Sequence, residues 1–217
     1  LAFFRIEPGM TVVDYTPSGG WYTRILVPYL GSDGHYIGLN PDVRQGDEQQ
    51  KRYFAGLHAA FPAKAAEWTG VPASRIAAYN SDELPAALDG AVDRVVIFRM
   101  LHNLRRMGMI DRELDTIHRL LKPDGLLGIE QHRARPDAPD AYVDGSKGYL
   151  RQADVIRMVE ARGFTLVGTS EINANPADTA DHPEGVWELP PSLRTKREEL
   201  KPVGESDRMT LLFRKRT

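Results

Sequence analysis

The chain has 217 residues, of which 41% are hydrophobic and 27% charged, and its formal net charge at pH 7 is -2. These values are typical of one soluble globular domain with a substantial core, and no apolar run approaches the roughly 20 residues needed to cross a bilayer. The lack of a basic excess argues against nucleic acid as a partner, and the absence of cysteine excludes disulfides, thiolate catalysis and zinc-thiolate sites.

The first two thirds of the chain alternate between short apolar runs and segments of helical periodicity, as expected of a parallel sheet covered on both faces. This pattern predicts strands at Met10–Tyr15, His35–Leu39, Arg75–Tyr79, Arg94–Arg99 and Leu126–Glu130. A first helix is predicted from the apolar stripe Tyr22, Ile25, Leu26, Tyr29 and Leu30, which Gly31 ends.

Three further helical segments follow along the chain. Residues 48–68 favour helix but contain Pro62, so two helical pieces are expected there. A stripe from Ile110 to Leu121 is closed by "KPDG", where Pro123 ends the helix and Gly125 permits a left-handed turn. A last stripe, Val155, Ile156 and Val159, ends at Arg162-Gly163.

The last third of the chain changes character. Residues 164–172 and 207–215 are β-like and predict an antiparallel pair that completes the sheet. The segment between them is rich in Pro, Asp and Glu and is too long for a simple hairpin loop. We therefore expect a single domain, residues 1–217, with lid or substrate loops at 133–150 and 173–206.

The stretch "TVVDYTPSGGWYTRIL", residues 11–26, has the form of a ligand-binding loop: a buried strand, a turn and a helix start. Free N–H groups at Gly19 and Gly20 can approach a polar ligand, and the Asp14 carboxylate can pair with an ammonium group. A G-x-G-x-x-G fingerprint is absent, because Thr16 and Ser18 stand where glycines would be expected. The alternative is that Asp14 merely caps the turn.

The order of these elements, with this loop, "LHNL" after the fourth strand, "LLKPDG" before the fifth and the terminal β-pair, resembles a class I S-adenosylmethionine-dependent methyltransferase over nearly the whole chain. "GGWYT" further resembles a poorly characterised bacterial branch of that family. The resemblance implies an α/β fold, a doubly wound, mostly parallel seven-stranded Rossmann-like sheet with a terminal antiparallel strand. It also implies that S-adenosylmethionine is bound by Asp14, Thr16, Ser18, Gly19, Gly20, Trp21, Asn40, Ser81, Asp82, Arg99 and Met100.

The chain departs from the family's pattern at three of these positions. Thr16 and Ser18 replace glycines of the D-x-G-x-G-x-G turn, which implies either a reshaped turn or a weaker site. Asn40 replaces the acidic residue that faces the ribose hydroxyls, with Asp42 as a nearby substitute. Asn40 and Asp82 are also compatible with an ordinary role in turn formation.

Two histidines are candidates for proton transfer, because methyl transfer needs alignment of the acceptor and sometimes a general base. His132, which follows the fifth strand, is the first candidate, and His102, which follows the fourth, is the second. Either could instead be a hydrogen-bonded structural residue. No metal is predicted, because these histidines and the carboxylates lack a diagnostic ligand spacing.

The sequence therefore favours an enzyme that transfers a methyl group from S-adenosylmethionine to a small organic acceptor. One alternative is a binding or regulatory protein of the same fold with weakened or lost transfer activity. A nicotinamide-dependent dehydrogenase ranks lower, because it requires G-x-G-x-x-G. A homodimer is compatible with the sequence. We take the cytoplasm as the default compartment. Because the sequence begins with Leu1 instead of Met, an export signal before Leu1 is compatible with it, and the periplasm is the alternative.

Overall fold

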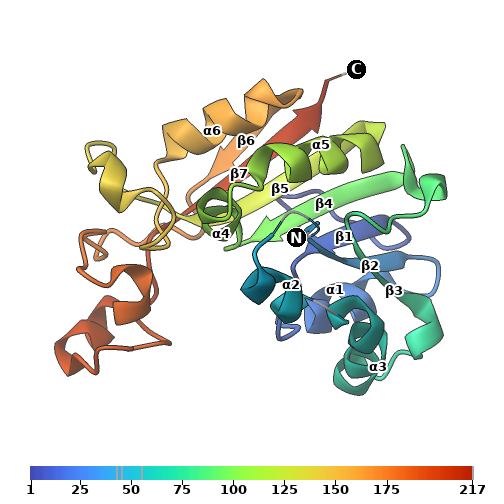
Figure 1. Cartoon of the computed structure of the whole chain (residues 1–217), viewed down its shortest axis with the longest axis horizontal. Coiled ribbons are helices and arrows are strands. Elements are labelled where there is room, and N and C mark those ends of the chain that lie inside the picture. Colours follow the sequence, from blue (N-terminus) through green and yellow to red (C-terminus); the bar gives the residue numbers. More distant parts are fainter. Residues whose placement is uncertain (43, 45, 55, 217) are drawn as a thin grey trace.

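A seven-stranded sheet is the centre of the computed structural model, which describes residues 1–42, 44, 46–54 and 56–216 (Figure 1). The strand order is β3-β2-β1-β4-β5-β7-β6. Strands β1 to β5 are parallel, and β7 lies antiparallel between β5 and β6. The strands are β1 (Thr11–Tyr15), β2 (His35–Asn40), β3 (Ile76–Asn80), β4 (Val92–Phe98), β5 (Leu121–His132), β6 (Phe164–Ser170) and β7 (Arg208–Lys215). The predicted fold class, including the terminal antiparallel pair, is confirmed.

Helices cover both faces of the sheet, so the central strands are buried on both sides as their continuous apolar runs predict. Side chains of α1 and α3 pack with Val12, Tyr36 and Val96 on one face. Side chains of α4, α5 and α6 pack with residues such as Val13 and Ile97 on the other. The helices are α1 (Thr23–Leu30), α2 (Glu48–Phe54), α3 (Leu57–Thr69), α4 (Leu101–Arg106), α5 (Ile110–Leu120) and α6 (Gln152–Ala161). None of the described helices is long and apolar enough to traverse a bilayer.

The buried face of α1 differs from the predicted one. Ile25 and Tyr29 are exposed, whereas Thr23 and Val27 are buried beside Leu26 and Leu30. Residues 23, 26, 27 and 30 form a second series with helical spacing, and the Thr23 hydroxyl is satisfied because it lies 2.9 Å from the Tyr36 hydroxyl. Polar Thr23 concealed this series in the sequence.

Two breaks in the chain also fall differently from expectation. Two helical pieces occupy residues 48–69 as predicted, but Pro62 lies inside α3 and does not separate them. The interruption is at Gly56, because its φ of 74° is incompatible with a continuing helix. Residue 55 lies outside the described part. Gly125 does not take a left-handed conformation. Residues 122–125 instead bulge from the ladder, since Val92 pairs with Leu121 and Arg94 with Leu126.

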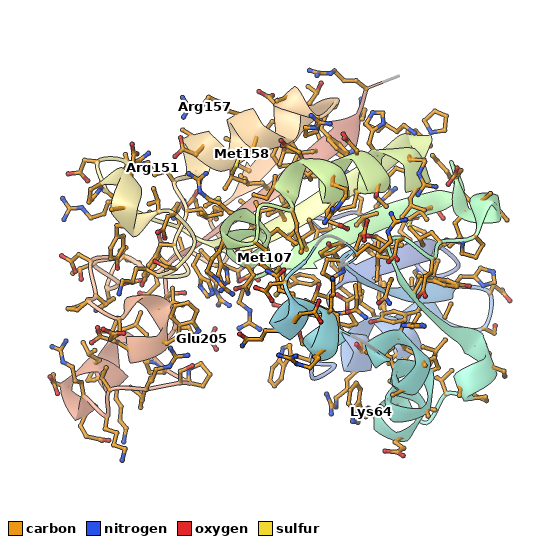
Figure 2. All side chains as sticks on the ribbon, in the orientation of Figure 1. Lys64, Met107, Arg151, Arg157, Met158 and Glu205 are labelled. Carbon is orange, nitrogen blue, oxygen red and sulfur yellow. The ribbon has the colours of Figure 1, made fainter. Side chains whose placement is uncertain are left out.

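Residues 133–150 and 173–206 pack together beyond the carboxyl ends of β5 and β6, and we call them the cap (Figure 1). The cap has its own small apolar cluster: Ala134, Ala138, Val143, Tyr149, Ala180 and Val186, with Tyr142 and Trp187 against it. The buried Asp178 carboxylate accepts hydrogen bonds from the Tyr149 hydroxyl at 2.8 Å and from the Asp207 backbone N–H at 2.7 Å. Arg151, at the start of α6, holds the first cap segment through the Ala138 carbonyl at 2.9 Å (Figure 2). The two segments are therefore an ordered unit held together by buried contacts.

The order of the strands reverses at β1, which pairs with β2 on one side and β4 on the other. In open α/β sheets, ligands bind outside the carboxyl ends of the strands at such a point, because the adjacent connections leave in opposite directions. The turn after β1 and the start of α4 after β4 lie at this edge, which fixes where the site can be.

Candidate active site

The turn after β1 keeps a left-handed backbone at the three positions where the D-x-G-x-G-x-G pattern has glycine. The φ angles are 55° at Thr16, 48° at Ser18 and 75° at Gly20. The sequence left two alternatives, a reshaped turn or a weaker site. The backbone angles show that the turn is not reshaped at these positions. Side chains with a Cβ are disfavoured in this region, so Thr16 and Ser18 hold strain that glycine would not.

Gly20 is required for a second reason, which is packing. A Cβ at Gly20 would lie 2.1 Å from the Trp68 ring on α3, whereas a Cβ at Gly19 would meet no atom within 4 Å. Trp68 also receives Arg24 over its ring at 4.5 Å. The turn is therefore wedged between α1 and α3, which makes its conformation part of the folded structure.

Asp14 is buried and points to the face of the sheet that α1 covers. Its carboxylate accepts a hydrogen bond of 2.8 Å from the Tyr36 hydroxyl. Burial raises the pKa of Asp14 to about 7, and the hydrogen bonds from Tyr36 and Thr23 oppose that rise. Asp14 lines a small cavity of about 300 Å³ under the turn, the turn cavity, together with Thr16, Pro17, Gly19, Trp21, Tyr22, Arg24, Phe98 and Arg99.

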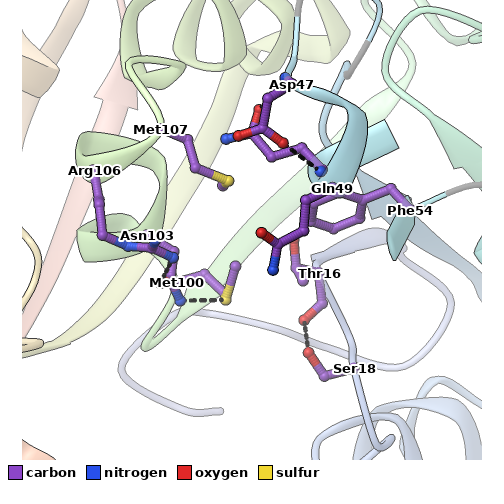
Figure 3. A pocket seen from close by; sticks show the side chains of 10 residues that line it. Thr16, Ser18, Asp47, Gln49, Phe54, Met100, Asn103, Arg106 and Met107 are labelled. Atoms are coloured by element: carbon purple, nitrogen blue, oxygen red, sulfur yellow. Dashed lines mark hydrogen bonds between the residues drawn. The ribbon is translucent and has the colours of Figure 1, made fainter. Parts of the chain in front are cut away.

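A larger cavity of about 460 Å³, the α2 cavity, opens between the turn and two helices (Figure 3). Phe54 and Gln49 face it from α2, and Asn103 and Arg106 face it from α4. The Asn103 amide donates to the Met100 sulfur at 3.4 Å, and Ser18 Oγ donates to the Thr16 carbonyl at 3.3 Å. The full set is Thr16, Ser18, Asp47, Gln49, Gln50, Phe54, Met100, Asn103, Arg106 and Met107. The α2 residues carry no sequence motif, and the sequence interpretation missed them.

The predicted residues at the ends of β2 and β3 belong to a neighbouring buried cluster. Asn40 and Ser81 are buried, and Ser81 Oγ donates to Glu113 of α5 at 3.0 Å. Asp82 faces Arg44, whose Nε lies 3.5 Å from Asp82 Oδ2. The structure describes all three predicted residues, and none of them lines the α2 cavity.

Asp42 and Glu113 complete this cluster. Asp42 accepts hydrogen bonds from Arg44 at 2.9 and 3.1 Å, and these bonds hold the pKa of Asp42 below its ordinary value. Burial raises the pKa of Glu113, while bonds from the Asp42 backbone and Ser81 oppose the shift. Glu113 could have been found from the sequence, because it is a charged residue within the apolar stripe of α5.

Several buried polar atoms at this edge have no hydrogen-bond partner within the described chain. They include Thr16 Oγ1, Asn80 Oδ1 and Asp82 Oδ1, which come from the ends of β1 and β3. Buried polar groups normally have partners, so such atoms require an explanation. A ligand with hydroxyl and amino groups, such as a nucleoside, matches them chemically.

A third cavity of about 320 Å³, the histidine cavity, lies between the sheet edge and the cap. The sheet side supplies Arg99, His102 and His132, and the cap supplies Val186, Trp187, Pro190, Pro191, Ser192, Glu205 and Ser206. It shares Thr16, Ser18, Met100 and Asn103 with the α2 cavity, so the two form one continuous cleft. The structure thus brings both predicted histidines together with the turn.

The two histidines lie side by side, with ring centroids 5.8 Å apart. His132 Nδ1 is 2.5 Å from Ser206 Oγ, and His102 Nδ1 is 3.4 Å from the Gln131 side-chain amide. Trp187 contacts the His102 ring edge-on at 6.0 Å between centroids. Ser206 and Trp187 were not predicted, because they belong to a segment without periodicity.

Both rings are expected to be neutral at pH 7. Burial lowers the pKa of His102 to about 4, with Arg106 adding to the effect and the Gln131 hydrogen bond opposing it. Burial also lowers the pKa of His132 well below its ordinary value, and His102, Arg99 and Arg208 lower it further. A neutral imidazole can accept a proton, and the lowered pKa makes either ring a weak base. Within the described residues, no three metal-binding side chains lie close enough together to hold an ion.

Comparison with known proteins supports the fold. No protein-family model matches the chain, and no curated protein matches it in sequence. In structure it is similar to a SAM-dependent methyltransferase from Aquifex aeolicus, with TM-score 0.57 and 15% identity over 98% of this chain and 86% of that one. It is also similar to a 1,6-didemethyltoxoflavin-N1-methyltransferase from Burkholderia thailandensis with bound S-adenosylhomocysteine, with TM-score 0.53 and 16% identity over 97% and 72% of the two chains.

A third similar structure is the [4+2]-cyclase SpnF, with TM-score 0.59 and 16% identity over 98% of this chain and 77% of that one. At these identities the likeness shows that the chain has the class I methyltransferase fold. A cyclase among the similar structures illustrates that this fold does not by itself fix the reaction. The function must be argued from the cleft.

Proposed function

We propose that the protein transfers a methyl group from S-adenosylmethionine to a small organic acceptor in the cleft formed by the α2 and histidine cavities. The observation that carries the proposal is the turn after β1. It keeps a left-handed backbone at Thr16, Ser18 and Gly20, although two of these residues are not glycine. Strain of this kind persists at ligand sites, where function compensates for it.

The cofactor is proposed to lie on the α2 side of the cleft. Thr16, Ser18 and Gly19 would bind it through turn hydroxyl and N–H groups, Trp21 would border it, and Met100 would form the floor. Thr16 lines the α2 cavity, and its Oγ1, which has no partner within the described chain, is a candidate to bond a polar group of the cofactor. Asp14 stays a candidate for its ammonium, in competition with the hydrogen bond from Tyr36.

The acceptor is proposed to lie in the histidine cavity, beneath Trp187 of the cap. Bound S-adenosylmethionine supplies a methyl group attached to a positively charged sulfur. Held by Thr16, Ser18 and Gly19, the cofactor would supply this methyl group to an acceptor atom in the histidine cavity and would itself leave as a neutral thioether. Neutral His132, oriented by Ser206, takes the acceptor's proton, and His102 is the second candidate for this role.

A calorimetric titration with S-adenosylhomocysteine tests the proposal directly. We expect micromolar binding by the wild-type chain and at least a tenfold loss with Gly20→Ala, because a Cβ there would collide with Trp68 and displace the turn. Gly168→Ala on β6 is the matched control, because its Cβ would make only ordinary contacts, the nearest at 3.5 Å to the Phe3 ring, and Gly168 lines none of the three cavities. Absence of binding by the wild-type chain at high micromolar ligand would remove the main support for the proposal.

The second candidate function is a binding protein of the same fold without methyl transfer. Thr16 and Ser18 favour it, since side chains at two positions where the family's pattern has glycine hinder close approach of the cofactor to the turn backbone. The engagement of Asp14 by Tyr36 favours it too. Cofactor binding without turnover of tritiated methyl groups over a broad acceptor panel would support this candidate over the enzyme.

A further inference from the structure

Arg99 lies where β4 ends, and its backbone departs from the strand. Phe98, the last residue of β4, points toward α1 and stacks on Tyr22 at 3.5 Å between ring centroids. Because side chains alternate along a strand, Arg99 would point to the opposite face. Its left-handed backbone, with φ of 54°, returns it to the face of Phe98. Its Nε there lies 3.9 Å from Glu130 Oε2, and its Cζ 6.0 Å from the Tyr22 ring centre.

The Arg99 guanidinium makes no hydrogen bond to any residue that the structure describes, although its side chain is only 34% exposed. Two other arginines of this region form ion pairs at short distance. Arg208 pairs with Glu130 at 3.0 Å and with Glu205 at 2.9 Å. Arg133 donates to both Asp207 and Glu171. Glu130 thus lies closer to Arg208 than to Arg99, and at 3.9 Å it forms no hydrogen bond with the Arg99 guanidinium.

These available donors face ligand space. Arg99 lines both the histidine cavity and the turn cavity, so it stands between the proposed acceptor position and the turn. The planar guanidinium presents parallel N–H groups that match the two oxygens of a carboxylate, and such charge-assisted pairs are strong where water is partly excluded. Among the described residues, Glu130 at 3.9 Å is the one ion-pair partner of Arg99, so its guanidinium N–H groups have no acceptor at hydrogen-bond distance.

We propose that Arg99 binds a carboxylate group in the cleft, an inference that rests on the proposed function. The carboxylate has two sources: an acidic group on the acceptor, reached from the histidine cavity, or the amino-acid carboxylate of the cofactor, reached from the turn cavity. Both place the negative charge beside Arg99, and they differ in which ligand loses affinity when Arg99 is changed.

The test measures the affinities of four ligands for wild type, Arg99→Gln and Arg99→Lys by calorimetry or saturation-transfer NMR. S-adenosylhomocysteine is compared with 5′-methylthioadenosine, which lacks the amino-acid part. Benzoate is compared with uncharged benzyl alcohol, both with S-adenosylhomocysteine present. Arg157→Gln on α6 is the control for net charge, because Arg157 is exposed and far from Glu205 of the histidine cavity (Figure 2).

We expect Arg99→Gln to lower the affinity for one carboxylate ligand about tenfold or more. Its uncharged counterpart should change less than about twofold, and Arg99→Lys should retain part of the affinity. Loss confined to S-adenosylhomocysteine assigns the cofactor carboxylate, and loss confined to benzoate assigns the acceptor. Two results would overturn the proposal. In the first, Arg99→Gln binds both carboxylate ligands as tightly as wild type does. In the second, wild type does not bind benzoate, and Arg99→Gln binds S-adenosylhomocysteine as tightly as wild type does. If wild type binds no S-adenosylhomocysteine, the proposed function fails and benzoate alone decides the role of Arg99.

Discussion

Replacing Thr16 or Ser18 with glycine is predicted to stabilise the protein, which is the opposite of the usual effect of a new glycine. A left-handed backbone costs a residue with a Cβ roughly 1–2 kcal/mol, and glycine avoids that cost. The added freedom of glycine in the unfolded chain offsets roughly 0.5–1 kcal/mol of the gain. Each substitution should therefore raise the free energy of unfolding by up to about 1.5 kcal/mol, with a central value of about 0.75 kcal/mol.

Side-chain contacts alter this balance little. Thr16 Oγ1 is buried without a partner, so its removal loses no hydrogen bond within the described chain. Ser18 Oγ makes one exposed bond of 3.3 Å, to the Thr16 carbonyl, and such a bond contributes little in water.

Urea denaturation followed by tryptophan fluorescence measures the change, and Thr165→Gly provides the comparison. Thr165 is exposed on β6 with an ordinary backbone, so glycine there should destabilise by about 1 kcal/mol. The reasoning is refuted if Thr16→Gly and Ser18→Gly lose as much stability as Thr165→Gly. If the turn binds the cofactor, the two glycine variants should also bind S-adenosylhomocysteine at least as tightly as wild type.

Two further predictions concern the histidine cavity and the cap. Because burial lowers the folded-state pKa of His102 to about 4, folding favours the neutral ring, and stability should fall as the pH drops from about 6.5 toward 4. His102→Gln should flatten this dependence by up to roughly 3 kcal/mol. Substitution of the exposed His35 with Gln is the control and should leave it in place. Equal slopes of stability against pH for wild type and His102→Gln, measured by denaturation, would contradict the assignment. Asp178→Ala should destabilise by about 2–3 kcal/mol and speed proteolysis within residues 173–206, because Asp178 accepts from Tyr149, His182 and the Asp207 backbone. Asp181→Ala, which removes an exposed carboxylate, should leave the cleavage rate unchanged, and similar cleavage of both variants would show that Asp178 does not hold the cap.

The sheet was predictable because its strands are short apolar runs separated by turn residues. The terminal β-pair followed from the same pattern, and all seven strands lie within a few residues of their predicted positions. The errors arose where two physical patterns overlap. In α1, Thr23 and Val27 compete with Ile25 and Tyr29 for the buried face, and only packing against Tyr36 decides between them.

The turn was found from the sequence because strand, turn and helix are contiguous. The two cap segments were predicted as lid or substrate loops, but the contacts that hold them over the sheet edge were not, because these contacts join residues far apart in the chain. Ser206 reaches His132 across 74 positions, and Trp187 reaches His102 from a short 3-10 turn at Gly185–Glu188. No local pattern marks either residue. Because the cap packs over the sheet edge, both histidines line a single cavity together with cap residues.

Strain at the sheet edge connects the turn with Arg99. Thr16 and Ser18 follow β1, Arg99 follows β4, and these are the adjacent strands between which the order of the sheet reverses. At roughly 1–2 kcal/mol each, three left-handed side chains amount to a substantial part of the stability of a single domain. Their backbone places hydroxyls and a guanidinium against shared cavities, Thr16 and Arg99 lining the same two. Because both residues line the same cavities, we expect the turn and Arg99 to act as one site. Thr16→Gly and Arg99→Gln should be non-additive for S-adenosylhomocysteine if its carboxylate pairs with Arg99, and additive if the acceptor's carboxylate does.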